Sequence, residues 1–143
     1  MPGMHRALVE PGQAEMVYNG AVKVIRWIAG RWGMETSEAM PMETVLNDVR
    51  AFASRAHEML PDADIWLYGS YAKGRATSAS DIDVAVIVPD GIFSPRELMD
   101  RQIELFKAGF EINPCMEPCI FVEGTDLLGF VDREVKGRGI HIV

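Results

Sequence analysis

Two aspartates separated by one residue are the first feature of this sequence that could do chemistry. Asp81 and Asp83 open an apolar run that is typical of a buried strand, and alternate residues of a strand project from the same face. Two neighbouring carboxylates repel each other, and a divalent cation relieves that repulsion. Because hard oxygen ligands with few other protein donors suit Mg²⁺, the pair predicts a magnesium site.

A Gly-Ser pair precedes the aspartates by a spacer of ten residues. Gly69 and Ser70 follow the β-prone run 65–68, at the point where a strand would end and a short helix begin. Such a junction presents free backbone N–H groups to a phosphate. Glycine permits close approach, and the serine hydroxyl adds a donor and could cap the helix. A phosphate cradle beside metal-binding carboxylates indicates phosphoryl or nucleotidyl transfer.

Each half of this pattern also has a simpler interpretation. A Gly-Ser pair often marks nothing more than a turn, and an Asp-x-Asp is often a solvated or capping pair. The conjunction favours a site, because the Gly-Ser closes one strand, the aspartates open the next, and a short helix fits between them.

The arrangement resembles the nucleotidyltransferases of the DNA polymerase β superfamily, whose signature is Gly-Ser, a short spacer and Asp-x-Asp. The spacing of ten is similar to that of the minimal nucleotidyltransferase group, over roughly residues 42–143. The resemblance implies a two-metal transfer of a nucleoside monophosphate, with ATP as the expected substrate and two Mg²⁺ ions as cofactors. Asp81 and Asp83 would hold both ions, and Gly69 and Ser70 would hold the β- and γ-phosphates.

The resemblance also implies a third acidic residue on a neighbouring strand. Glu117 stands immediately before a third β-prone run and is our candidate for the third metal ligand and catalytic carboxylate. Glu111 is the competitor, and Asp126 is explained more simply as a first-turn helix residue. Glu117 could instead be an exposed residue at a strand end, and many relatives have aspartate at this position.

Two cations after the Gly-Ser pair are candidates for nucleotide binding. Lys73 and Arg75 could offset the charge of the triphosphate and stabilise the pyrophosphate leaving group, or they could be solvated surface charges. We expect Ser78 and Ser80 to arrange the turn before the aspartates, and Tyr71 to pack against the sheet.

The elements that must position these residues follow from hydrophobic periodicity and from helix caps and stops. Apolar spacing predicts four helices. Ser94 opens the third helix and Gly109 ends it, and Thr125 caps the fourth. The predicted helices cover 13–31, 42–60, 95–108 and 125–136, and the predicted strands cover 65–68, 81–88, 117–122 and 140–143. This order predicts an α/β (α+β) fold, a small mixed sheet packed by helices, with an N-terminal helical extension at 1–40 and the transferase domain at 41–143.

Composition bounds the class of protein. The chain has 143 residues and a net charge of −7, from 14 Lys and Arg against 21 Asp and Glu, which suits one globular domain. No apolar run is long enough to span a membrane, and we expect a cytoplasmic protein. Cys115 and Cys119 are expected to be buried free thiols.

The acceptor is the open part of the functional prediction. Net negative charge and the lack of a basic run disfavour a polynucleotide. Antibiotic-modifying relatives add a C-terminal helical domain, for which this sequence leaves no room. The resemblance to stand-alone minimal nucleotidyltransferases implies transfer of AMP to a protein hydroxyl, with this chain as the antitoxin of a helical HEPN partner. The 13–31 helix could dock a partner, form a homodimer or simply extend the core.

The alternative is a binding module of the same fold that has lost catalysis and neutralises or scaffolds a partner protein. The position of Glu117 distinguishes the two functions. Convergence with Asp81 and Asp83 within coordinating distance favours the transferase, and separation favours the binding module.

Overall fold

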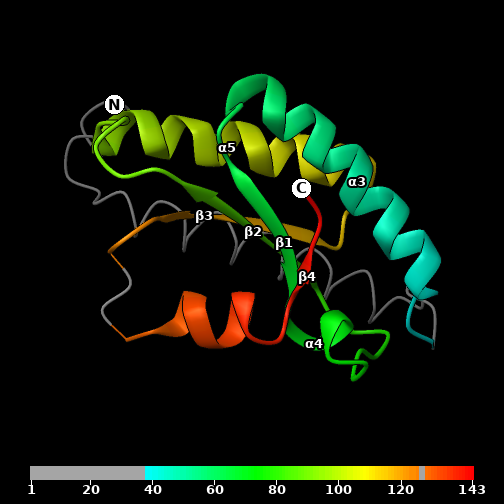
Figure 1. Ribbon diagram of the computed structural model, residues 1–143. Helices are drawn as coiled ribbons and strands as arrows, with labels where there is room; N and C mark the ends of the chain where they lie inside the picture. The colour runs from blue at the N-terminus through cyan, green and yellow to red at the C-terminus, as the bar shows by residue number, and fades with distance from the viewer. Residues whose placement is uncertain (1–37, 126–127) are drawn as a thin grey trace, which may run out of the picture.

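The computed structural model describes residues 38–125 and 128–143, which form a four-stranded sheet with helices on both faces (Figure 1). This arrangement confirms the predicted fold class. The elements in chain order are α3 (Met42–Met59), β1 (Asp64–Tyr68), α4 (Gly69–Ala72), β2 (Ile82–Val88), α5 (Pro95–Ile112), β3 (Met116–Val122), the π-helix η1 (Val131–Lys136) and β4 (Ile140–His141).

The sheet is mixed, with the strand order β3-β2-β1-β4. Strand β1 is antiparallel to both β2 and β4, and β2 is parallel to β3. The parallel pair needs a crossover, and α5 supplies it. Strand β2 is therefore an inner strand with both faces covered, as its nearly continuous apolar sequence predicted.

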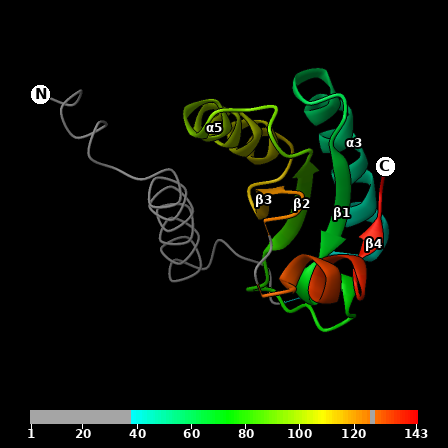
Figure 2. The same ribbon diagram turned by 60° about the vertical axis from the view of Figure 1, so that its left-hand side comes forward.

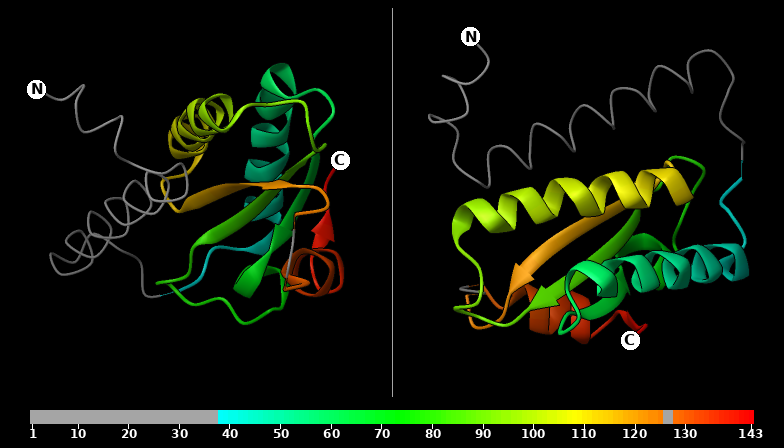
Figure 3. Two further views of the ribbon diagram at one scale, coloured as in Figure 1. Left: turned by 90° about the vertical axis from the view of Figure 1, so that its left-hand side faces the viewer. Right: turned by 90° about the horizontal axis from the view of Figure 1, so that it is seen from above.

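Helices α3 and α5 lie together over one face of the sheet and enclose the main core (Figures 2 and 3). The inward faces of these helices meet alternate residues of β1 and β2. Buried side chains of this core include Val45, Val49, Phe52, Leu60, Ile65, Leu67, Ile82, Val84, Val86, Leu105 and Met116. Each large aliphatic or aromatic residue buried here contributes roughly 1.5–3 kcal/mol relative to exposure.

The opposite face of the sheet is covered by the short helix η1 (Figure 2). Val131 and Val135 of η1 pack against Ala85 and Ile87 of β2. Beside them the rings of Tyr68, Phe121 and Phe130 form a cluster, with centroids 5.9–6.2 Å apart. The strand alternation places Asp83 and Glu117 on this same face.

Helix α5 continues past the predicted stop at Gly109 and ends at Ile112. Gly109 is buried against β3, where an added Cβ would lie 3.4 Å from atoms of Met116 and Pro118. The glycine therefore lets the helix approach the strand. The C-cap residue is Asn113, whose backbone is extended, immediately before Pro114.

The last helix differs most from its prediction. It is a π-helix of six residues beginning at Val131, and Leu128 lies outside it and is 85% exposed. Thr125 lies six residues before this helix, whose N-cap residue is Phe130, and the Thr125 hydroxyl donates to the carbonyl of Val122 in the turn that ends β3 (2.8 Å). The sequence alone could not show that the Thr125 hydroxyl would hydrogen-bond at the end of β3 and not at the start of a helix.

The remaining predictions on organisation have mixed outcomes. Cys115 and Cys119 are free thiols but are half-buried, not buried as predicted. None of the described helices is both long and apolar enough to cross a membrane. The predicted 13–31 helix and nearly all of the 1–40 extension lie outside the described residues, so the domain division stays a prediction.

Candidate metal and nucleotide site

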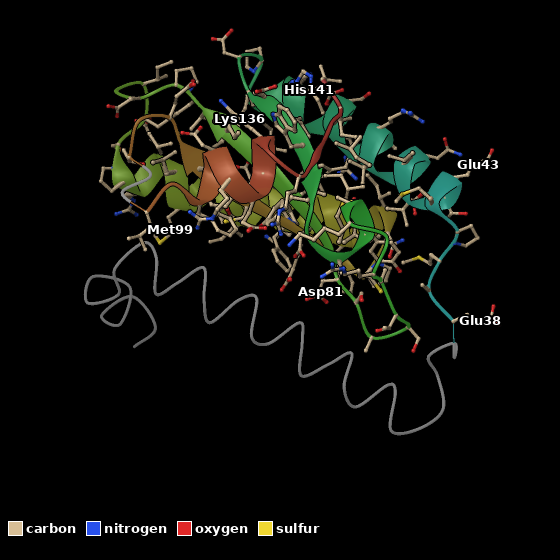
Figure 4. All side chains as sticks on the ribbon, turned by 60° about the horizontal axis from the view of Figure 1, so that its bottom comes forward. Glu38, Glu43, Asp81, Met99, Lys136 and His141 are labelled. Carbon is tan, nitrogen blue, oxygen red and sulfur yellow. The ribbon has the colours of Figure 1, made fainter. Side chains whose placement is uncertain are left out.

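Three carboxylates converge at one end of the sheet. Asp81, Asp83 and Glu117 each offer one oxygen, and these oxygens all lie within 4.8 Å of one another. Asp81 and Asp83 are half-buried, whereas Glu117 is only 8% exposed. Figure 4 shows Asp81 at the side of the molecule that carries α4, well separated from Lys136 on η1 and His141 on β4. The convergence is the arrangement that the transferase interpretation required.

Strand pairing explains how residues so far apart in sequence meet. Asp83 and Glu117 are direct partners in the parallel register of β2 and β3. Asp81 immediately precedes β2 and lies two residues before Asp83, which places it on the same face. Since Glu117 is the second residue of β3 and is buried, it is not an exposed strand-end residue.

Gly69 brings the backbone into contact with this carboxylate group. Tyr68, the last residue of β1, pairs with Asp83, so the chain turns into α4 directly beside the aspartate. Gly69 has a φ of +77°, and a Cβ there would overlap Oδ2 of Asp83. Both the left-handed backbone and the close approach require glycine at this position.

Ser70 lies within the single turn of α4 and does not cap it. The N-cap residue is Tyr68, and no side chain caps this turn. A four-residue helix has little macrodipole, so the backbone N–H groups and the Ser70 hydroxyl are what it offers to an anion.

The loop between α4 and β2 is held in part by the side chains of Thr77 and Ser80, as expected for Ser80 but with Thr77 where Ser78 was predicted. The hydroxyl of Ser80 accepts a hydrogen bond from the Thr77 backbone N–H (2.8 Å).

Tyr71 packs into the core at 4% exposure, and its hydroxyl accepts from the Met40 N–H (3.2 Å).

Of the two predicted phosphate-binding cations, Lys73 has a carboxylate partner in the structure. Its Nζ lies 2.9 Å from Oε2 of Glu134 on η1. The hydrogen bond from Lys73 holds the pKa of the Glu134 carboxyl below its usual value, with help from the charges of Arg138 and Arg133. Arg75 is exposed, directly after the α4 turn.

The donor set fits a hard divalent cation. All three groups are carboxylates, and neither sulfur nor imidazole belongs to the cluster. Oxygen ligands on opposite sides of one Mg²⁺ or Ca²⁺ ion stand about 4–5 Å apart, which matches the spread of these oxygens. Glu111, the competing third acid, is 65% exposed and pairs with Arg55 of α3 at 2.8 Å, away from the cluster. Asp126 lies outside the described residues.

Two residues of the site region were not identified from sequence. Glu134 carries no local signal, because it meets Lys73 only through the packing of η1 against the sheet. Gln102 gave a signal that could have been used, since it is a polar residue on the inward stripe of α5 with Phe106 one turn later. It is 6% exposed and bonds to the backbone of β3.

The comparisons with known proteins agree with this geometry. The nucleotidyltransferase domain family matches residues 49–136, which include the Gly-Ser pair and all three carboxylates. A crystal structure of a candidate nucleotidyltransferase from Sulfolobus solfataricus superposes with a TM-score of 0.50 at 18% identity, covering 70% of this chain and 80% of that one. This likeness supports the fold. A search of curated proteins found no significant match.

The fold and the carboxylate site thus define a transferase of the nucleotidyl-transfer class. The chain belongs to the nucleotidyltransferase domain family, which confirms its predicted place in the DNA polymerase β-like superfamily. Domains of this family generally use a nucleoside triphosphate and a divalent metal ion, and the carboxylate cluster described above is suited to bind such an ion.

Proposed function

We propose that this protein transfers AMP from ATP to a hydroxyl group of a partner protein, with Mg²⁺ as the cofactor. The observation that carries the proposal is the convergence of Asp81, Asp83 and Glu117 beside the Gly69 turn. A module that only binds a partner has no need of a third carboxylate at this point, so the geometry favours catalysis over the silent alternative.

The roles of the residues follow from their positions. Asp81 and Asp83 would bind two Mg²⁺ ions, and Glu117 would join them at the ion nearer the acceptor hydroxyl. When bound, the ions neutralise charge on the attacking and leaving oxygens. The acceptor oxygen forms a bond to the α-phosphorus as the bond to the bridging oxygen of pyrophosphate breaks. The hydroxyl proton passes to one carboxylate of the cluster.

The phosphate tail would lie along the α4 turn. Gly69 and Ser70 would hold the β- and γ-phosphates through the backbone and the serine hydroxyl, and Lys73 and Arg75 would offset the charge of the departing pyrophosphate. Because Lys73 pairs with Glu134 in this structure, the triphosphate would have to share Lys73 with Glu134 or displace Glu134 from it.

Charge supports a protein acceptor. With a net charge of −7 the surface repels a phosphate backbone, and the sequence has no basic run to offset that repulsion. The resemblance to stand-alone minimal nucleotidyltransferases favours a HEPN-like partner, for which this chain would act as the antitoxin.

The test follows the phosphate that is transferred. The purified protein and Mg²⁺ are added to lysate of the source organism with ATP labelled on either the α- or the γ-phosphate. We expect one protein to acquire label from the α-phosphate alone, and mass spectrometry to locate AMP on a hydroxyl side chain. Asp83→Asn should abolish labelling, whereas Asp90→Asn, an exposed residue beyond the far end of β2, should not.

Two results would contradict the proposal. Label from the γ-phosphate would indicate phosphoryl transfer. Equal labelling by wild type and Asp83→Asn, or no labelling while the protein still captures a partner, would favour the silent binding module.

A further inference from the structure

We propose that Gln102 is a positioning residue for the metal site, whose side-chain amide holds the outer edge of β3 and so keeps Glu117 beside Asp83. This inference rests on the proposed function, because it concerns the role of Glu117 in metal binding. Gln102 lies on α5, does not belong to the carboxylate cluster and acts only through the strand.

The side-chain amide of Gln102 bonds to β3 in the way that a backbone peptide group of an adjacent strand would. Its Nε2 donates to the carbonyl oxygen of Pro118 at 2.7 Å, and its Oε1 accepts from the backbone N–H of Ile120 at 2.8 Å. The reversed amide would set donor against donor and acceptor against acceptor, so these partners fix its orientation. At 6% exposure, the side chain has little water available to replace these bonds.

Strand β3 needs support on this side because β2 is its only partner among the described strands. Immediately beyond the two ends of β3, the Ile82 N–H bonds to the Cys115 C=O and the Glu123 N–H bonds to the Val88 C=O. In a parallel ladder, alternate residues bond toward the partner, so Pro118 and Ile120 present their backbone groups to the outer edge. Gln102 occupies the place that a further strand would take.

The point of attachment is next to the metal ligand. Glu117 immediately precedes Pro118 and pairs with Asp83 across the sheet. Proline has no N–H, so its carbonyl is the one backbone group through which the edge can be held at residue 118. Without the Gln102 amide, two polar backbone groups against α5 lose their partners and the strand must shift to satisfy them. Metal-binding groups must be held within about 0.5 Å of their productive positions.

The test measures metal affinity directly, with Mn²⁺ as the probe. Gln102→Met keeps the length of the side chain and removes both hydrogen bonds. We expect it to weaken Mn²⁺ binding, measured by electron paramagnetic resonance, by roughly 10-fold or more, as is usual when groups that orient metal ligands are removed. Amide hydrogen exchange at Ile120 should accelerate in the same variant.

A matched control separates positioning from general destabilisation. Val49→Ala opens a cavity in the core at α3, where Val49 is fully buried, and should leave Mn²⁺ affinity unchanged at temperatures where both variants are folded. Gln102→Asn keeps the amide on a shorter side chain and should also weaken binding, which provides a second variant should Gln102→Met fail to fold.

The outcomes are distinct. Wild-type affinity in Gln102→Met, or equal weakening in Val49→Ala, would overturn the positioning role while leaving the metal site intact. Failure of the wild type to bind Mn²⁺, or equal binding by Asp83→Asn, would instead overturn the metal assignment on which the proposed function rests, and this inference with it.

Discussion

Gly69 and Asp83 are in contact across the β1–β2 hairpin, so closely that a Cβ on residue 69 would overlap the aspartate carboxylate and lie 3.2 Å from its Cγ. Gly69 directly follows β1 and Asp83 lies at the start of β2, and these two strands pair in register with Tyr68 opposite Asp83. The turn that we propose to bind phosphate and the carboxylate that we propose to bind the metal are therefore one structural unit.

Replacing Gly69 with alanine should damage both stability and metal binding. The residue has a φ of +77°, where a Cβ costs about 1–3 kcal/mol, and the clash with Asp83 adds to that cost. Gly74→Ala is the matched control, because Gly74 has a φ of +70° but an added Cβ meets nothing within 4 Å. Urea unfolding should show a larger loss for Gly69→Ala, and Mn²⁺ affinity should fall in that variant alone. Equal losses in the two variants would show that the contact with Asp83 has no effect.

Mg²⁺ should stabilise the folded protein through the carboxylate cluster. A cation that binds only the folded state at 100 times its Kd adds about 2.7 kcal/mol, or roughly 10 °C in Tm for a domain of this size. Thermal unfolding followed by circular dichroism should show this shift in wild type and in Asp90→Asn. Glu117→Gln should lose most of the shift, since the carboxylate oxygen of Glu117 lies within 4.8 Å of those of Asp81 and Asp83, close enough to share one ion. An unchanged shift in Glu117→Gln would exclude it as a ligand.

The Lys73–Glu134 ion pair should give stability a pH dependence in the acid range. Lys73 lowers the pKa of Glu134 from its usual 4.5. A carboxyl with a lowered folded-state pKa contributes stability above its unfolded pKa, and that contribution disappears as pH falls through the folded value. Lys73→Met should therefore be less stable than wild type at pH 7 and equal to it in strong acid. Carbon-detected NMR should show the pKa of Glu134 rising in Lys73→Met.

Lys136→Met is the control for loss of a positive charge on the same surface. Its Nζ lies 3.7 Å from Glu123, and it is not among the causes of the Glu134 shift. A similar rise of the Glu134 pKa in both variants would show that general charge, and not the hydrogen bond from Lys73, sets the value.

The start of α5 should depend on Ser94. Its hydroxyl oxygen accepts from the Glu97 N–H at 3.2 Å, and Pro95 occupies the first helical position. Ser94→Ala should cost about 1 kcal/mol in urea unfolding. Ser54→Ala, at an exposed position within α3 where the hydroxyl only bonds back to Arg50, should change stability by less than about 0.5 kcal/mol. Equal losses of stability in the two variants would show that the Ser94 cap contributes no more than an ordinary serine on a helix surface.

The sequence predicted most of the regular elements, because their signals are local. Helix α3 begins at Met42 as its apolar stripe indicated and ends two residues before Pro61, and β1, β2 and β3 lie within one residue of their predicted limits. The predictions failed where a local signal served a different partner. Gly109 gives α5 close contact with β3 and does not end the helix, and Thr125 bonds to Val122 and lies six residues before the described helix η1.

The sequence by itself determined the candidate chemistry at the two ends of the β1–β2 connection, because Gly69-Ser70 and Asp81-x-Asp83 are set by spacing along the chain. Only the tertiary structure decided which acid completes the cluster. The parallel register of β2 and β3 pairs Asp83 with Glu117, and the long α5 crossover between these strands leaves that register unspecified locally. The partners Lys73–Glu134 and Gln102–Pro118 were decided in the same way, since packing between separate elements brings them together.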